Sequence, residues 1–125
     1  MDEIEGSNSA LAGIPAVVLR VDLPHLRAWT NARRDAAARY NTLLAEVEGV
    51  RTPPVAEGRE HVYHLYVIEH EERDALRAHL SAAGIGTVIN YPTALPFLEA
   101  YARFRHTAAD FPVAHHMQSR ILSLP

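Results

Sequence analysis

The chain has 125 residues, of which 48% are hydrophobic and 22% charged, and its net charge is −3 with the histidines neutral. This composition is typical of one globular domain, and the weak charge excludes the strongly basic surface on which nucleic acid or an anionic membrane is usually bound. The longest apolar run, residues 14–19, is too short to span a bilayer, and the acidic N-terminus does not resemble a signal peptide. We therefore expect a cytoplasmic protein that binds neither nucleic acid nor membrane.

Two residue types are absent from the chain. It has no cysteine and no lysine, and all 12 of its Lys or Arg side chains are arginines. The first absence excludes disulfides, thiolate nucleophiles and cysteine metal sites, and no two of the eight histidines have the i, i+4 spacing of a helical metal pair. The second excludes Schiff-base chemistry on a side chain of this chain. We therefore expect neither a metal nor a bound cofactor.

The first half of the chain has the pattern of helices. We expect residues 1–10 to form a short arm, after which apolar residues recur at three- and four-residue spacing up to Val47, as along one helix face. Because proline is disfavoured inside a helix, Pro24 divides this pattern into a helix over 11–22 and one over 24–47. The next segment, EGVRTPPVAEGRE, has adjacent prolines and no period, which predicts a loop.

The second half mixes strand and helix patterns. It predicts a strand over 62–68, an amphipathic helix over 71–83, a strand over 85–90, a short helix near 95–103, a last helix over 111–119 and the start of a strand in the final ILSLP. Leu76 and Leu80 face inward from the amphipathic helix, and Gly84 ends it. Alternation along the first strand places one set of side chains on a common face, namely Val62, His64, Tyr66 and Ile68.

This order of elements predicts an α+β fold, with one domain over residues 1–125 and a small antiparallel or mixed sheet covered by helices. Such a sheet has unpaired edges, and the long helix carries an apolar stripe that a chain of this size cannot cover by itself. We therefore expect a homo-oligomer, most simply a dimer, with these residues near the interface: Leu19, Leu23, Leu26 and Trp29.

Five segments of the chain, in this order, resemble a known family: LPHLRAWTNARRDAAARYNTLLAEV, HVYHLYVI, RDALRAHLSAAGI, NYPTALPFLEAY and FPVAHHMQSRILSLP. They are similar to the C-terminal domain of the DegT/StrS family of pyridoxal-phosphate-dependent sugar aminotransferases. The resemblance covers nearly the whole chain and implies the small α+β domain of such an enzyme. It also implies that the family's large N-terminal domain, with the cofactor pocket and the lysine that holds pyridoxal phosphate, is missing from this chain.

The chain departs from the family at positions that carry function there. In GSNSALAGIPA it keeps Asn8, which in the family reaches the cofactor phosphate of the neighbouring subunit. Other functional positions of the family hold different residues here, namely Ala10, Ala12 and Pro15 in this segment, Asn90 and Pro96 in INYPTALPF, and His115 in FPVAHHM. The resemblance therefore implies an inherited scaffold in which the transaminase site has changed.

We place the candidate site where the strand over 85–90 ends, because strand ends hold side chains rigidly beside a crevice. The candidate catalytic residues, which are suited to proton transfer, are Tyr91, His115 and His64. The candidate substrate-binding residues are Asn90, Tyr66, Phe97, Val88 and Asn8. Structural alternatives exist for the catalytic candidates: a hydrogen-bonded core histidine for His64, a buried tyrosine paired with backbone for Tyr91, and an exposed helix residue for His115.

Three functions remain open at this level. The first, which we favour, is a cofactor-independent enzyme that performs cyclisation, isomerisation or other acid–base chemistry on a small-molecule substrate. The family resemblance places it in specialised-metabolite or deoxysugar biosynthesis. The second is a non-catalytic partner of a split or full-length DegT-family aminotransferase. The third is an inert remnant or an excerpt of a longer chain, against which the Met1 start and the acidic arm argue.

Overall fold

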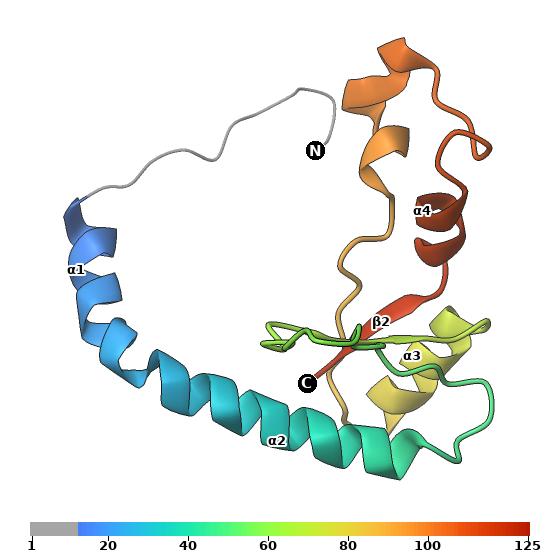
Figure 1. Cartoon of the computed structure of the whole chain (residues 1–125). Coiled ribbons are helices and arrows are strands. Elements are labelled where there is room, and N and C mark those ends of the chain that lie inside the picture. The colour runs from blue at the N-terminus through green and yellow to red at the C-terminus, as the bar shows by residue number, and fades with distance from the viewer. Residues whose placement is uncertain (1–12) are drawn as a thin grey trace.

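The computed structural model describes residues 13–125 and combines helices with a small antiparallel sheet (Figure 1). Its helices and strands are α1 (Gly13–Asp22), α2 (Leu26–Leu44), β1 (Tyr66–Glu69), α3 (Arg73–Ala82), α4 (Pro112–Met117) and β2 (Ile121–Leu124). The 3₁₀ helices of this part of the chain are η1 (Leu23–His25), η2 (Leu95–Phe97) and η3 (Glu99–Phe104). The predicted α+β class is confirmed. The predicted arm over 1–10, with Asn8, lies outside the described residues.

The helices α1, η1 and α2 form a long helical arm. Pro24 lies in η1, so the helix predicted over 24–47 begins as a tighter turn and becomes α-helical at Leu26, because the proline ring disfavours a regular helical interior. The α2 helix passes along one side of the sheet, whereas α1 projects away from the rest of the fold (Figure 1). The residues predicted near an interface are 44–68% exposed on this arm: Leu19, Leu23, Leu26 and Trp29.

The sheet consists of β1 paired antiparallel with β2, in a register that sets Tyr66 opposite Leu124 and Glu69 opposite Ile121. Isolated bridges extend it on both sides. Arg51 exchanges backbone hydrogen bonds with Glu69, and Val88 does so with Ser123. The final ILSLP therefore forms the predicted strand. The predicted strand over 85–90 is reduced to the single bridge at Val88, because the chain leaves the short β2 edge on either side of that residue.

The predicted strand over 62–68 is also too long. Tyr63 has a left-handed backbone with φ 47°, and its N–H donates to Nδ1 of His61 at 2.9 Å, which forms a local turn in place of extended backbone. The strand therefore begins at Tyr66. As a consequence, Tyr66 and Ile68 are buried as predicted, whereas Val62 and His64 precede the strand and are exposed.

The core lies between α2, α3 and the sheet. Its buried apolar residues are Ala37, Tyr66, Ile68 and Leu122, with Tyr40, Leu44, Leu76, Leu80 and Ile89 among those packed against them. The rings of Tyr40 and Tyr66 stack with centroids 4.8 Å apart, and the hydroxyl of Tyr66 donates to Oδ1 of Asn41 at 2.6 Å. Burial raises the pKa of Tyr66, with Tyr63 and Tyr40 contributing in the same direction. The inward placement of the two α3 leucines is confirmed.

Arg73, at the start of α3, ties this helix to the C-terminal segment. Its guanidinium is buried, pairs with Asp74 at 2.7 Å, and donates to the main-chain oxygens of Gln118 and Ile121 at 3.3 and 3.4 Å. These carbonyls follow α4 and begin β2. The arginine therefore fixes the position of α3 relative to the α4–β2 connection.

The segment between the sheet and α4 is less regular than its sequence pattern predicts. The helix predicted near 95–103 is divided into η2 and η3, because Leu98 between them has an extended backbone with ψ 148°. The last predicted helix, over 111–119, is α4, which begins at Pro112 with the proline in its first turn, where the missing N–H costs no hydrogen bond. No helix of residues 13–125 is long and apolar enough to cross a membrane.

Candidate functional site

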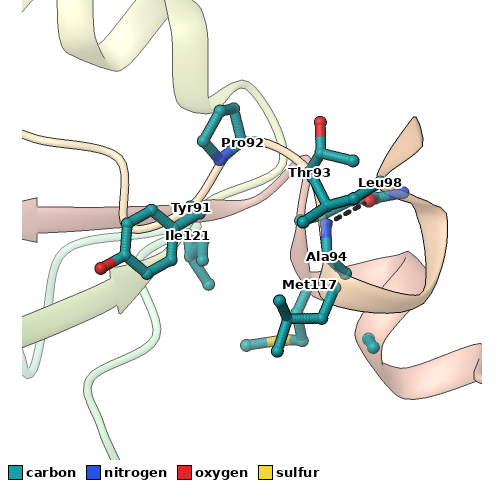
Figure 2. A pocket seen from close by; sticks show the side chains of 10 residues that line it. Tyr91, Pro92, Thr93, Ala94, Leu98, Met117 and Ile121 are labelled. Atoms are coloured by element: carbon teal, nitrogen blue, oxygen red, sulfur yellow. Dashed lines mark hydrogen bonds between the residues drawn. The ribbon is translucent and has the colours of Figure 1, made fainter. Parts of the chain in front are cut away.

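A cavity of about 480 Å³ lies between the segment that follows Asn90 and the α4–β2 connection (Figure 2). It is lined by Tyr91, Pro92, Thr93, Ala94, Leu95, Leu98, Ala114, Met117, Gln118 and Ile121. None of these residues is charged, and most contribute apolar surface. The volume is in the range of cavities that hold small molecules, and the chemistry of the wall favours a neutral ligand.

One hydrogen bond holds the two sides of the cavity together. The N–H of Ala94 donates to Oε1 of Gln118 at 2.9 Å, drawn as a dashed line in Figure 2. Pro92 and Pro96 restrict the backbone on either side of Ala94, which lowers the entropy that the unfolded segment would lose on folding. The loop is thus held in place by its two prolines and by the side chain of Gln118 on the opposite wall.

Tyr91 is the predicted catalytic residue that lines this cavity. Its side chain is 73% exposed, and Figure 2 shows its ring at one end with the hydroxyl directed away from Ala94 and Met117. Asn90, just before it, accepts a hydrogen bond from Oγ of Ser123 at 3.0 Å and so is bound to the sheet. Tyr91 therefore marks the opening of the cavity, and Asn90 connects that opening to β2.

His115 and Phe97 are brought together near the cavity but do not line it. Their rings meet edge to face, with centroids 5.4 Å apart. His115 is exposed on α4, and Phe97 is half-buried at the end of η2. Val88 is exposed and takes part in the sheet through its backbone. The structure therefore pairs His115 with Phe97 and places Tyr91 on the cavity wall, while the roles of these residues stay predictions.

His64 and Tyr66 lie in a different place. They line a second cavity, of about 530 Å³, between α2 and the end of β2, together with Tyr40, Tyr63 and Pro125. The hydroxyl of Tyr40 donates to the main-chain oxygen of Pro125 at 3.1 Å. Of the predicted site residues, Tyr91 therefore lines the first cavity, whereas His64 and Tyr66 line the second. Asn8, the remaining predicted binding residue, lies outside the described part of the chain.

Displaced pKa values occur away from the uncharged cavity. A hydrogen bond from Arg120 lowers the pKa of Glu71, and hydrogen bonds from Thr107 lower the pKa of Asp110. Neither carboxyl lines the cavity. Among the described residues, no group of three or more His, Asp or Glu side chains is arranged to hold a metal ion. Within the cavity itself, Tyr91 is the titratable side chain among the lining residues.

Sequence reasoning missed Gln118, which lines the cavity and holds its loop. A signal for it was present. Ala114 and Gln118 are four residues apart within the helix predicted over 111–119, as residues on one helix face are, and both line the cavity. A polar residue beside the apolar Ala114 on such a face would have indicated a hydrogen bond or a ligand contact.

The whole chain, residues 1–125, matches the DegT/DnrJ/EryC1/StrS aminotransferase family. The chain belongs to this family. It is 39% identical over 123 residues to the erythromycin biosynthesis sensory transduction protein EryC1 of Saccharopolyspora erythraea, covering 98% of this chain and 34% of that protein. It is 38% identical to the dTDP-3-amino-3,4,6-trideoxy-α-D-glucose transaminase of Streptomyces venezuelae, covering 98% of this chain and 32% of that enzyme.

Solved structures agree with this assignment. The structure of S. venezuelae DesV in complex with a ketimine intermediate matches with a TM-score of 0.88 and 38% identity, over 98% of this chain and 33% of that one. A DegT/DnrJ/EryC1/StrS aminotransferase from Brucella abortus matches with a TM-score of 0.81 and 39% identity, over 96% and 32%. The resemblance found in the sequence is thus confirmed. The chain spans about one third of the length of these relatives.

The residues of this chain do not by themselves fit pyridoxal phosphate, the cofactor that the family implies. The cofactor's aldehyde needs a lysine amine, and the chain has none. Its phosphate needs a cationic side chain or a cradle of backbone N–H groups, whereas the cavity wall is uncharged and its Ala94 N–H is already paired.

Proposed function

We propose that this chain acts as a partner-dependent domain of a sugar-nucleotide aminotransferase assembly, in which another polypeptide portion supplies the cofactor and its lysine. The relatives' names supply the substrate class, because they include transaminases of dTDP-linked and UDP-linked amino sugars. The supporting observation is the amount of surface that the described fold leaves uncovered. A cytoplasmic location, as predicted from the sequence, belongs to the same proposal.

The described fold exposes more surface than a compact monomer of its mass. The accessible surface is 10,032 Å², whereas a compact monomer of 13.9 kDa should expose about 6,700 Å². Residues 1–12 can account for at most about 1,800 Å² of this difference, the surface that an unfolded chain of their mass would expose. The accessible surface then still exceeds that of a compact monomer by about 1,500 Å². One partner of a standard protein interface buries about 800 Å². The excess is therefore large enough for a stable interface.

The chemistry of that surface fits a protein partner. Large apolar side chains of the arm, including Val17, Val21 and Leu23, are more than 60% exposed. Contiguous exposed apolar side chains favour an interface with another polypeptide, because removing them from water lowers the free energy and the monomer by itself does not bury them. Relatives three times as long contain enough additional chain to cover such an arm.

Hydrogen–deuterium exchange with native mass spectrometry tests the proposal. The intact S. venezuelae transaminase, to which the chain is 38% identical, would be mixed with the chain at tens of micromolar. We expect a complex heavier by 13.9 kDa per bound chain and slower exchange in peptides covering residues 16–29. A Leu19→Glu/Leu23→Glu variant should lose both signals. Absence of a complex, with unchanged exchange in the arm, would contradict the proposal.

A second function, the cofactor-independent enzyme favoured by the sequence, retains one supporting observation. Tyr91 stands at the opening of an uncharged cavity, with the His115 and Phe97 pair close to the same wall. If these groups perform acid–base catalysis, Tyr91→Phe and His115→Ala should each lower turnover roughly ten-fold or more. Unchanged turnover in both variants would exclude them as catalytic groups.

A further inference from the structure

The cavity beside Tyr91 contains few polar side chains. Those among its lining residues are Tyr91, Thr93 and Gln118. Figure 2 shows the hydroxyl of Tyr91 directed away from Met117 and that of Thr93 directed away from it as well, and both residues are exposed. Gln118 differs because it is half-buried and held by a hydrogen bond. It is therefore the polar side chain of this wall with a fixed orientation.

The hydrogen bond to Ala94 decides which atom Gln118 can offer to a ligand. A backbone N–H can only donate, so the amide oxygen, Oε1, must be the atom that faces Ala94. The amide nitrogen, Nε2, then remains as a donor with two hydrogens. Among residues 13–125 it has no hydrogen-bond partner in the protein, and no buried side-chain polar atom of this part of the chain is left unpaired. Nε2 is therefore accessible.

From this donor and the uncharged wall we infer that Gln118 is the recognition residue of the cavity, and that the cavity binds a neutral, mainly apolar small molecule. The ligand presents one acceptor oxygen, a carbonyl or ether, to Nε2 of Gln118. An anion is disfavoured because no cationic side chain lines the wall to replace its lost hydration. This inference concerns a ligand of the chain itself and does not depend on the proposed aminotransferase partner.

The substitution Gln118→Glu separates recognition from loop support. Glutamate keeps an oxygen that accepts from the Ala94 N–H, so the loop stays held, but its other terminal atom can no longer donate when ionised. A second variant, Ala114→Phe, fills the cavity from α4 without changing Gln118. The two variants thus remove the donor and the space independently.

Binding would be measured by ¹H–¹⁵N NMR titration of the whole chain with two probes of one carbon skeleton. Camphor carries a ketone acceptor, and bornylammonium carries only donors. We expect camphor to shift the side-chain amide signal of Gln118 in the wild type. Gln118→Glu should weaken camphor binding about ten-fold, the loss of one hydrogen bond, and should strengthen bornylammonium binding. Ala114→Phe should abolish binding of both probes.

Three results would overturn the inference. The first is equal camphor affinity in the wild type and in Gln118→Glu while the Ala94 amide signal shows that its hydrogen bond is kept. The second is a folded wild type that binds no camphor, which would make the cavity a contact surface for a polypeptide instead of a small-molecule site. Retained camphor binding in a folded Ala114→Phe variant would also exclude the cavity as the binding place.

Discussion

Asp110 is an exposed residue whose chemistry is set by its immediate neighbours. It lies in the turn before α4, where the N–H and the hydroxyl of Thr107 both donate to its Oδ2 at 2.8 Å. These hydrogen bonds favour the ionised carboxylate and lower its pKa, the backbone donor having the larger effect. The turn it stabilises leads directly into Phe111 and Pro112, the start of the helix that forms one wall of the cavity.

The first prediction concerns the titration of Asp110. Because its pKa is lower in the folded state than in the unfolded state, its contribution to stability is present above the unfolded pKa and is lost as the pH falls through the folded pKa. We expect carboxyl NMR signals of Asp110 to titrate below the ordinary aspartate value of about 3.9. In Thr107→Ala, which removes the hydroxyl but keeps the N–H, the pKa should rise only part of the way. An ordinary pKa in the wild type would contradict the geometry of this turn.

The second prediction concerns the missing lysine. Mixed with pyridoxal phosphate, the chain should show no Schiff-base absorption band from a side chain, because it has no primary amine there. Borohydride reduction followed by peptide mass spectrometry is the measurement, with the intact S. venezuelae transaminase as the positive control. A reduced adduct mapped to any side chain of residues 1–125 would disprove the prediction.

Among the elements, α3 shows how a single residue ends a helix. Gly84 follows its C-terminus with a left-handed backbone, φ +77°, and its N–H donates to the carbonyl of Ser81 at 3.0 Å. A residue with a Cβ is strained in this conformation, which is why glycine is favoured after a helix. The sequence predicted this stop correctly, because the backbone requirement is local.

The third prediction compares two nearby glycines. Gly84→Ala should lower the free energy of unfolding by about 1 kcal/mol, because alanine is strained at positive φ although no atom lies within 4 Å of its Cβ. Gly86→Ala is the matched control, since that position also has open space but no positive φ, and it should be neutral or slightly stabilising. Urea unfolding followed by circular dichroism would measure both. Equal destabilisation would show that backbone strain is not the cause.

The same elements show what the sequence could not reveal. The helices α2 and α3 follow from apolar spacing, and β2 follows from the final ILSLP. The true start of β1 depends on the hydrogen bond between Tyr63 and His61, which alternation of residue types does not encode. The break between η2 and η3 depends on one extended residue, Leu98. The ends of these elements depend on the backbone conformation of single residues, which the spacing of apolar residues along the sequence does not reveal.

The sequence indicated where a rigid loop lies, while the roles of the candidate site residues stay predictions. Prolines around Tyr91 and the end of an apolar run indicated a rigid loop, and the cavity does lie beside that residue. His64 is separated from Tyr91 because it lies with Tyr66 at the second cavity, between α2 and the end of β2. Gln118 has a local signal in its four-residue spacing from Ala114, but its hydrogen-bond partner, Ala94, lies 24 residues earlier, and that spacing does not reveal the contact.

At the scale of the whole molecule, stability is limited by how little of the chain is enclosed. The buried apolar cluster of the described residues comprises Ala37, Tyr66, Ile68 and Leu122, and it lies between the sheet, α2 and α3. In the described part of the chain, α1 is joined to this core through η1 and α2 (Figure 1). A hydrophobic core of this size contributes little against the entropy of ordering 125 residues, so added burial in an assembly should raise the stability of the fold.

The last prediction is that the isolated chain associates with itself when no larger partner is present. The arm exposes Leu19, Leu23 and Leu26 at helical spacing, so a second copy can cover the same stripe by packing helix against helix. Light scattering at micromolar concentration should therefore give a mass clearly above 13.9 kDa. The double variant Leu23→Glu/Leu26→Glu should shift the equilibrium toward monomer by at least about ten-fold, because it places charge in the apolar contact.

Val113→Glu, the same kind of change at an exposed position of α4 outside the arm, is the control and should leave the mass unchanged. A wild-type mass of 13.9 kDa, or equal effects of the two charge substitutions, would show that the arm is not the surface through which the copies meet.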